Sequence, residues 1–101
     1  GRRVYMYKEV IGKNERIGKN GKAKCFCCGN YTIDRLFEEC SVCLWQYDGI
    51  DFDKSEDKRS APNGMSVKEA RKIFEEDGVC VPGFKHLVRD PIDDELPENN
   101  E

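Results

Sequence analysis

The clearest hydrophobic pattern in the chain predicts a helix over residues 67–77. Apolar residues recur there every three or four positions, with charged residues between them, at Val67, Ala70, Ile73 and Phe74. Ser66 followed by Glu69 is a capping box, which satisfies two backbone N–H groups at the start of the helix. Gly78 supplies the stop. We therefore expect one amphipathic helix whose apolar face packs on the rest of the protein.

Elsewhere the apolar runs are short and β-prone. They are Val4–Tyr7 with Val10–Ile11, Tyr31–Ile33, Val42–Trp45 and Val79–Phe84. Asn20-Gly21 is a two-residue hairpin signal that precedes the second run. Of the 101 residues, 38% are hydrophobic and 37% are charged, so material for a core is scarce. We expect a single domain that needs a cross-link to hold its core together.

Six cysteines can provide that cross-link. Five of them lie within nineteen residues, in Cys25-Phe26-Cys27-Cys28-Gly29 and Cys40-Ser41-Val42-Cys43, and Cys80 lies apart. Two Cys-x-x-Cys turns can close four thiolates around Zn²⁺ at about 2.3 Å per bond. The predicted ligands of one structural zinc ion are Cys25, Cys28, Cys40 and Cys43. A tetrahedral site of four cysteines leaves no position for water or substrate, so the metal is not expected to be catalytic.

Other uses of the thiols remain open at this point. Three disulfides are the alternative for a secreted protein, although disulfide frameworks usually spread their cysteines along the chain. Thiol redox chemistry is the enzymatic alternative, but the sequence lacks the βαβ pattern of a thioredoxin-like fold. Cys27 is interpreted as a small core residue, a weak hydrogen-bond partner of the site or a substitute ligand, and the first interpretation is favoured. Cys80 is given no role.

Charge is distributed unevenly along the chain. Residues 1–24 carry eight basic residues against Glu9 and Glu15, so their net charge is +6 and the remainder carries −9, for a total of −3. A basic arm of this kind can bind phosphates, with Tyr5, Tyr7 or Phe26 stacking on bases. A solvated hairpin is the favoured interpretation. Residues 90–101 are acidic and contain proline, and we expect them to form a disordered tail.

The remaining residues do not suggest an enzyme. An EF-hand loop starting at Asp51 would place Glu56 and Pro62 where glycine and glutamate are required, so a calcium loop is excluded. His86 is the one histidine and is expected to be a structural or surface residue, and no phosphate-binding glycine loop or His-Glu-x-x-His motif occurs. The sequence contains no run of about 18 apolar residues and no signal-peptide pattern, so we expect a cytoplasmic protein without a membrane partner.

From Cys25 to about Pro91 the chain resembles the cysteine-rich CPCC family of small bacterial proteins. The resemblance lies in both cysteine motifs, in Thr32-Ile33, in Trp45 and in the helix start from Asn63 to Arg71. Phe26 and Ser41 replace the prolines of the family's knuckles, and Gln46-Tyr47 stand where acidic residues are usual. The ligand thiols are unchanged, so the resemblance implies zinc binding and a shared fold rather than a particular activity.

These observations predict a small α+β, zinc-ribbon-like domain: two zinc knuckles with short antiparallel strands, plus one packed helix. The predicted organisation is a basic N-terminal strand and hairpin extension (residues 1–24), a CPCC domain (residues 25–89) and an acidic tail (residues 90–101). The predicted function is a non-catalytic, cytosolic protein-binding module, best interpreted as an immunity protein that docks on and blocks a basic toxin or nuclease domain. The alternative is a nucleic-acid-binding zinc ribbon that uses the basic N-terminal arm.

Overall fold

The computed structural model describes residues 17–48 and 56–101. The strands and the helix are β1 (Ala23–Lys24), β2 (Tyr31–Ile33), β3 (Arg59–Ser60), β4 (Met65–Ser66) and α2 (Val67–Asp77). Three short 3-10 helices follow, namely η1 (Lys85–Leu87), η2 (Asp93–Glu95) and η3 (Pro97–Asn99). The strand predicted over residues 4–11 and Asp51, the first position of the excluded calcium loop, lie outside the described residues.

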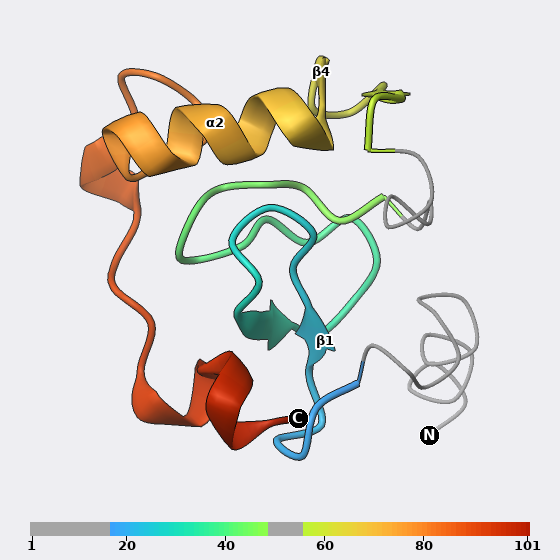
Figure 1. The fold of residues 1–101 in the computed structure, drawn as a ribbon, viewed down its shortest axis with the longest axis vertical. Helices are drawn as coiled ribbons and strands as arrows, with labels where there is room; N and C mark the ends of the chain where they lie inside the picture. The colour runs from blue at the N-terminus through green and yellow to red at the C-terminus, as the bar shows by residue number, and fades with distance from the viewer. Residues whose placement is uncertain (1–16, 49–55) are drawn as a thin grey trace.

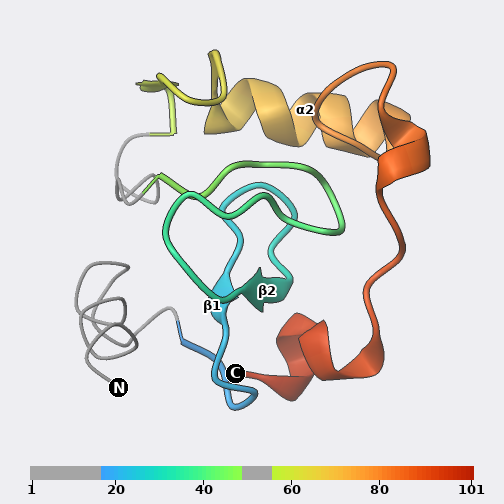
Figure 2. The ribbon, with the colours of Figure 1, turned by 180° about the vertical axis from the view of Figure 1, so that it is seen from behind.

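Helix α2 and the two strands β1 and β2 lie on opposite sides of the cysteine-bearing loops (Figure 1). The C-terminal segment runs from the end of α2 along one side of these loops and returns to β1, as the view from behind also shows (Figure 2). Within residues 17–48 and 56–101, this arrangement consists of two antiparallel hairpins, one α-helix and a cluster of cysteines. The predicted small α+β, zinc-ribbon-like fold is confirmed.

The first hairpin leads the chain into the first cysteine motif. Ile17 forms an antiparallel bridge with Ala23 across a turn in which the N–H of Gly18 donates to the carbonyl of Lys22 at 2.8 Å. Gly21 has a φ of 82°, a left-handed conformation that glycine adopts without steric cost. The turn predicted from Asn20-Gly21 is therefore present. After it, β1 pairs with β2 so that the first knuckle is held between the two strands.

Helix α2 begins and ends at the residues that the sequence predicts. Ser66 Oγ accepts the N–H of Glu69 at 3.1 Å, and Glu69 Oε1 accepts the N–H of Ser66 at 3.3 Å. Gly78 ends the helix with a φ of 74°. Val67 and Ala70 are fully buried against the core. The capping box, the stop and the buried face of the helix are all confirmed.

The core contains the cysteines and the aromatic side chains of the second motif. Trp45 and Tyr47 are fully buried, and the Tyr47 ring stacks on Phe26 with 5.4 Å between centroids. The strand predicted over Val42–Trp45 is wrong, because residues 41–43 form a turn that closes the second knuckle. Glu39 and Gln46 form an isolated bridge on either side of this turn.

The C-terminal segment differs from the disordered tail that the sequence predicts. Residues 90–101 contain η2 and η3, and Glu95 and Asn100 in this segment are buried. The side-chain amide of Asn100 donates to the carbonyls of Asp94 and Leu96, and its oxygen accepts the N–H of Asn20 at 2.9 Å. Hydrogen bonds of polar side chains, rather than apolar burial, therefore hold the segment, and composition alone does not reveal them.

Candidate metal centre

The two Cys-x-x-Cys turns bring four sulfur atoms together, as predicted. The Sγ atoms of Cys25, Cys28, Cys40 and Cys43 all lie within 4.8 Å of one another. The Cys25–Cys43 pair is separated by 3.5 Å and the Cys28–Cys40 pair by 3.7 Å. In a tetrahedron with metal–sulfur bonds of about 2.3 Å, neighbouring sulfurs are about 3.8 Å apart. The four thiols are therefore close enough to hold a metal ion.

Backbone geometry in each turn fixes the direction of the sulfurs. The N–H of Gly29 donates to the carbonyl of Cys25 at 3.0 Å, and the N–H of Leu44 donates to the carbonyl of Cys40 at 2.8 Å. In the second turn the N–H groups of Val42 and Trp45 point at sulfur, at 3.4 Å from Cys40 Sγ and 3.5 Å from Cys43 Sγ. Such N–H groups stabilise thiolates and orient them toward a metal.

Thr32 adds a side-chain contact to the same cluster. Its hydroxyl oxygen lies 3.0 Å from Cys40 Sγ, and the residue is buried on β2 between the two knuckles. A hydroxyl donates to a thiolate, so Thr32 would stabilise and orient the Cys40 sulfur when that sulfur holds a metal ion. The sequence predicts only that Thr32 lies in a strand. The order of apolar and polar residues in that strand does not show that the hydroxyl of Thr32 faces a sulfur atom.

Burial and hydrogen bonds between the sulfurs shift the thiol pKa values of this cluster in opposite directions. Burial raises the pKa of the Cys25 thiol well above its usual value, because the thiolate loses its hydration. Hydrogen bonds from Cys25, and then from Cys28 and Cys43, lower the pKa of Cys40 far below its usual value. A divalent ion held by the four sulfurs would favour the thiolate form of each of them.

Two cysteines without an assigned ligand role lie beside this centre. Cys27 and Cys80 are buried, and their Sγ atoms lie within 4.8 Å of each other and of Cys43 Sγ. Cys80 is far from the other cysteines in the sequence, so its position beside Cys27 and Cys43 was not expected. The sequence feature that indicates it is the apolar run Val79-Cys80-Val81, which directly follows the glycine that ends the helix and therefore favours a buried position for Cys80.

Two lysines of the basic N-terminal extension that the structure describes pair with carboxylates. Lys22 Nζ lies 3.0 Å from Asp34 Oδ2, and Lys24 Nζ lies 2.7 Å from Glu101 Oε2. Phe26 is 3% exposed, so the base-stacking role considered for it is wrong. His86 is exposed, as predicted, and its ring stacks on Phe84 with 6.2 Å between centroids.

A sequence profile of the cysteine-rich CPCC family matches residues 23–95, which include both knuckles, α2 and η2. The chain belongs to this family. Searches among curated proteins and among solved structures gave no match. The CPCC match begins at β1 and ends at Glu95. The family region therefore includes β1, which precedes the first knuckle, and the segment that runs from η1 to Glu95.

Over residues 17–48 and 56–101, none of the helices has both the length and the apolar character that a membrane span requires.

Proposed function

We propose that this CPCC protein is a non-catalytic, zinc-stabilised protein-binding module that acts in the cytoplasm. Four thiolate donors at tetrahedral spacing favour zinc over harder divalent ions. Cys25, Cys40 and Cys43 are each 1% exposed or less, which supports a structural role for the ion rather than a catalytic one. Reduced thiols and a thiolate-bound metal are typical of cytoplasmic proteins.

The observation that carries the binding proposal is the last turn of α2. Glu75, Glu76 and Asp77 are all exposed there, and the last turn itself holds no basic residue, although the side chain of Lys85 lies against Gly78 at the end of the helix. Carboxylates at a helix C-terminus oppose the helix dipole, at a cost of about 0.3–1 kcal/mol each. The three carboxylates do not favour the helix by themselves, and they would attract a basic partner, because complementary charge speeds association and selects the partner.

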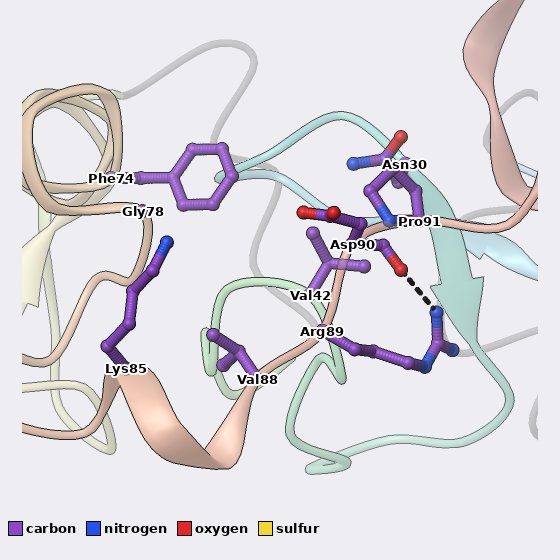
Figure 3. A pocket seen from close by; sticks show the side chains of 9 residues that line it. All are labelled: Asn30, Val42, Phe74, Gly78, Lys85, Val88, Arg89, Asp90 and Pro91. Atoms are coloured by element: carbon purple, nitrogen blue, oxygen red, sulfur yellow. Dashed lines mark hydrogen bonds between the residues drawn. The ribbon is translucent and has the colours of Figure 1, made fainter.

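Exposed apolar side chains follow directly after this acidic turn. Phe84 is 44% exposed and Leu87 is 57% exposed, and Lys85 between them lies against Gly78 at the end of α2. A pocket of about 490 Å³ opens near them and is lined by apolar Val42, Phe74 and Val88 and by charged Lys85, Arg89 and Asp90 (Figure 3). An apolar centre with charged residues around it is the usual composition of a protein-binding surface. We define residues 75–77, Phe84 and Leu87 as the docking surface.

The sharpest form of the proposal is an immunity protein that blocks a basic toxin or nuclease domain. Residues 25–101 carry a net charge of −9, which would attract such a domain from solution. The apolar side chains and the pocket would then receive anchor residues of the partner. This form of the proposal predicts fast association and an affinity that falls as salt rises.

The test is affinity capture from cells that naturally produce the protein. The full chain, loaded with zinc, is compared with a variant in which Glu75, Glu76 and Asp77 are changed to lysine. The matched control changes the exposed and dispersed residues Glu39, Asp57 and Glu98 to lysine. Both variants alter the net charge equally, and basic residues in the last helical turn complement the helix dipole, so we expect the helix variant to keep α2.

We expect the wild type and the dispersed control to capture the same basic protein, the helix variant to lose it, and salt at about 1 M to release it. Purified partner should then lose its own activity on addition of the wild type. Capture that disappears on nuclease treatment would instead support the nucleic-acid alternative. Equal capture by the helix variant would remove the docking surface from the proposal.

A further inference from the structure

Three buried thiols form a second group that overlaps the first metal centre. The Sγ atoms of Cys27, Cys43 and Cys80 lie within 4.8 Å of one another, and the exposed fractions of these residues are 7%, 0% and 1%. Cys43 belongs to both groups. The structure therefore contains two sets of sulfur donors that share one atom, and the six cysteines of the chain all belong to one set or the other.

Each member of the second group is placed by a defined element. Cys27 lies in the turn of the first knuckle, between two residues of the first group. Cys80 enters the core because Gly78 ends α2 in a left-handed conformation and turns the chain inward. The N–H of Cys80 then donates to the carbonyl of Cys43 at 2.8 Å, which fixes one segment against the other. Three separate segments thus converge on one point.

We propose that Cys27, Cys80 and the shared Cys43 form a second metal site, so that the protein holds a dinuclear cluster in which the Cys43 thiolate bridges two ions. Thiolate donors select soft or borderline ions such as zinc. On binding, the ion displaces the thiol protons of Cys27 and Cys80 to solvent and shares the thiolate of Cys43 with the first ion. No oxidant or other reactant is needed for this step.

Charge favours a divalent ion at the second site. Four thiolates around one Zn²⁺ carry a net charge of −2, and six thiolates around two Zn²⁺ also carry −2. The second divalent ion therefore neutralises the two additional thiolates, whereas a monovalent ion would leave an extra negative charge in a buried position. Burying uncompensated charge is costly, so the divalent ion is preferred.

The second site has an open coordination position. Three protein sulfurs leave one position of a tetrahedral zinc open, and a small ligand would complete it. A hollow of about 290 Å³ is lined by Cys27 and also by Cys25 and Cys28 of the first group, so it gives both groups an approach from solvent. The first group has all four positions filled by protein, so the second ion should exchange faster than the first.

The experiment counts ions on the full chain by native mass spectrometry at increasing Zn²⁺. We expect two ions on the wild type, and a weak chelator should remove one of them first. Cys27→Ser and Cys80→Ser should each bind one ion and keep the far-UV circular dichroism of the wild type. Val79→Ala, which alters the buried neighbour of Cys80 and leaves every sulfur in place, should still bind two.

Substitution with ¹¹³Cd²⁺ tests the shared sulfur directly. We expect two cadmium resonances and a correlation of the Cys43 β-protons with both of them. The proposal is overturned if the wild type binds one ion at saturating zinc, if both serine variants keep two ions, or if the second cadmium resonance shows no correlation with Cys43. A disulfide between Cys27 and Cys80 in protein isolated under reducing conditions would also overturn it.

Discussion

Gly29 and Leu44 occupy equivalent positions in the two knuckles, although one is a glycine and the other is not. Each follows the second cysteine of its motif, and their φ angles are 81° and 73°. Each donates its N–H to the carbonyl of the first cysteine of the motif. The second knuckle therefore holds a leucine in the left-handed conformation that the first knuckle gives to glycine, and a β-carbon is disfavoured in that conformation.

This relationship predicts an unusual order of stability at position 44. Leu44→Gly and Leu44→Ala both remove the side chain, but only alanine keeps the steric conflict, so Leu44→Gly should be more stable by about 1 kcal/mol. Urea unfolding at fixed zinc concentration measures the difference. Lys72 in the middle of α2 is the control, because there the alanine variant should be the more stable one by about 1 kcal/mol. The same order at both positions would contradict the assigned conformation of Leu44.

Metal removal should unfold the CPCC domain. Binding of a structural zinc contributes about 10–16 kcal/mol in small zinc domains, which is comparable to the whole stability of a typical protein of about 5–15 kcal/mol. We expect far-UV circular dichroism and zinc content to fall together as a strong chelator is added, and Cys40→Ser to remain unfolded at ordinary zinc concentrations. Protein that keeps its fold without metal would contradict the prediction.

Thr32 should tune metal affinity without being a ligand. Thr32→Val keeps the shape of the side chain but removes the hydroxyl that lies 3.0 Å from Cys40 Sγ. Loss of such a contact typically weakens metal binding at least tenfold, so about a tenfold rise in the zinc dissociation constant is expected. Competition with a chromophoric chelator measures this constant. Ser41→Ala, which removes an exposed hydroxyl next to the same cysteine, should leave it unchanged.

Local signals in the sequence were sufficient for much of this fold. Ser66, Glu69 and Gly78 define α2 because caps act within a few residues of one another. The spacing within Cys25–Cys28 and Cys40–Cys43 predicts the clustered thiols for the same reason. In both cases the residues that decide the structure are neighbours along the chain.

Contacts between distant segments were not predictable in this way. Cys80 reaches Cys43, and Asn20 reaches Asn100, only because the chain has already folded. The strand expected at Val42–Trp45 failed because closure of the knuckle overrides the β-propensity of these residues. The polar composition of residues 90–101 predicts disorder. The prediction failed because the sequence alone does not show that Glu95 is buried and paired with an arginine.

The Glu95 ion pair should contribute to stability with a defined pH dependence. Arg89 Nη1 and Nη2 donate to the two carboxylate oxygens at 2.8 Å each. These hydrogen bonds lower the pKa of Glu95 in the folded protein, although burial acts in the opposite direction. Because the unfolded value is about 4.3, the contribution is fully present above this pH and is lost as the pH falls through the lower folded value.

Glu95→Gln should therefore destabilise the C-terminal segment by about 1–2 kcal/mol at pH 7. A larger loss is not expected, because Arg89 is half-exposed and water screens its charge. The penalty should stay constant from pH 7 down to about pH 5. Hydrogen exchange at the amides of Leu96 and Asn100 measures it locally. Glu98→Gln makes the same chemical change at an exposed position and should have no effect. A penalty that grows as the pH is lowered would contradict the sign of the pKa shift.

Asn100 should be the most sensitive residue of the C-terminal segment. Its side-chain amide donates to the carbonyls of Asp94 and Leu96 at 2.9 and 2.8 Å. Asn100→Asp keeps the shape but sets a carboxylate oxygen against two carbonyl oxygens in a buried position, and we expect a loss of about 2–4 kcal/mol. Asn99→Asp is the matched control, because Asn99 is exposed and makes one such bond, to the carbonyl of Asp93. Zinc-saturated urea unfolding compares the two, and equal losses would mean that burial of Asn100 does not hold the segment in place.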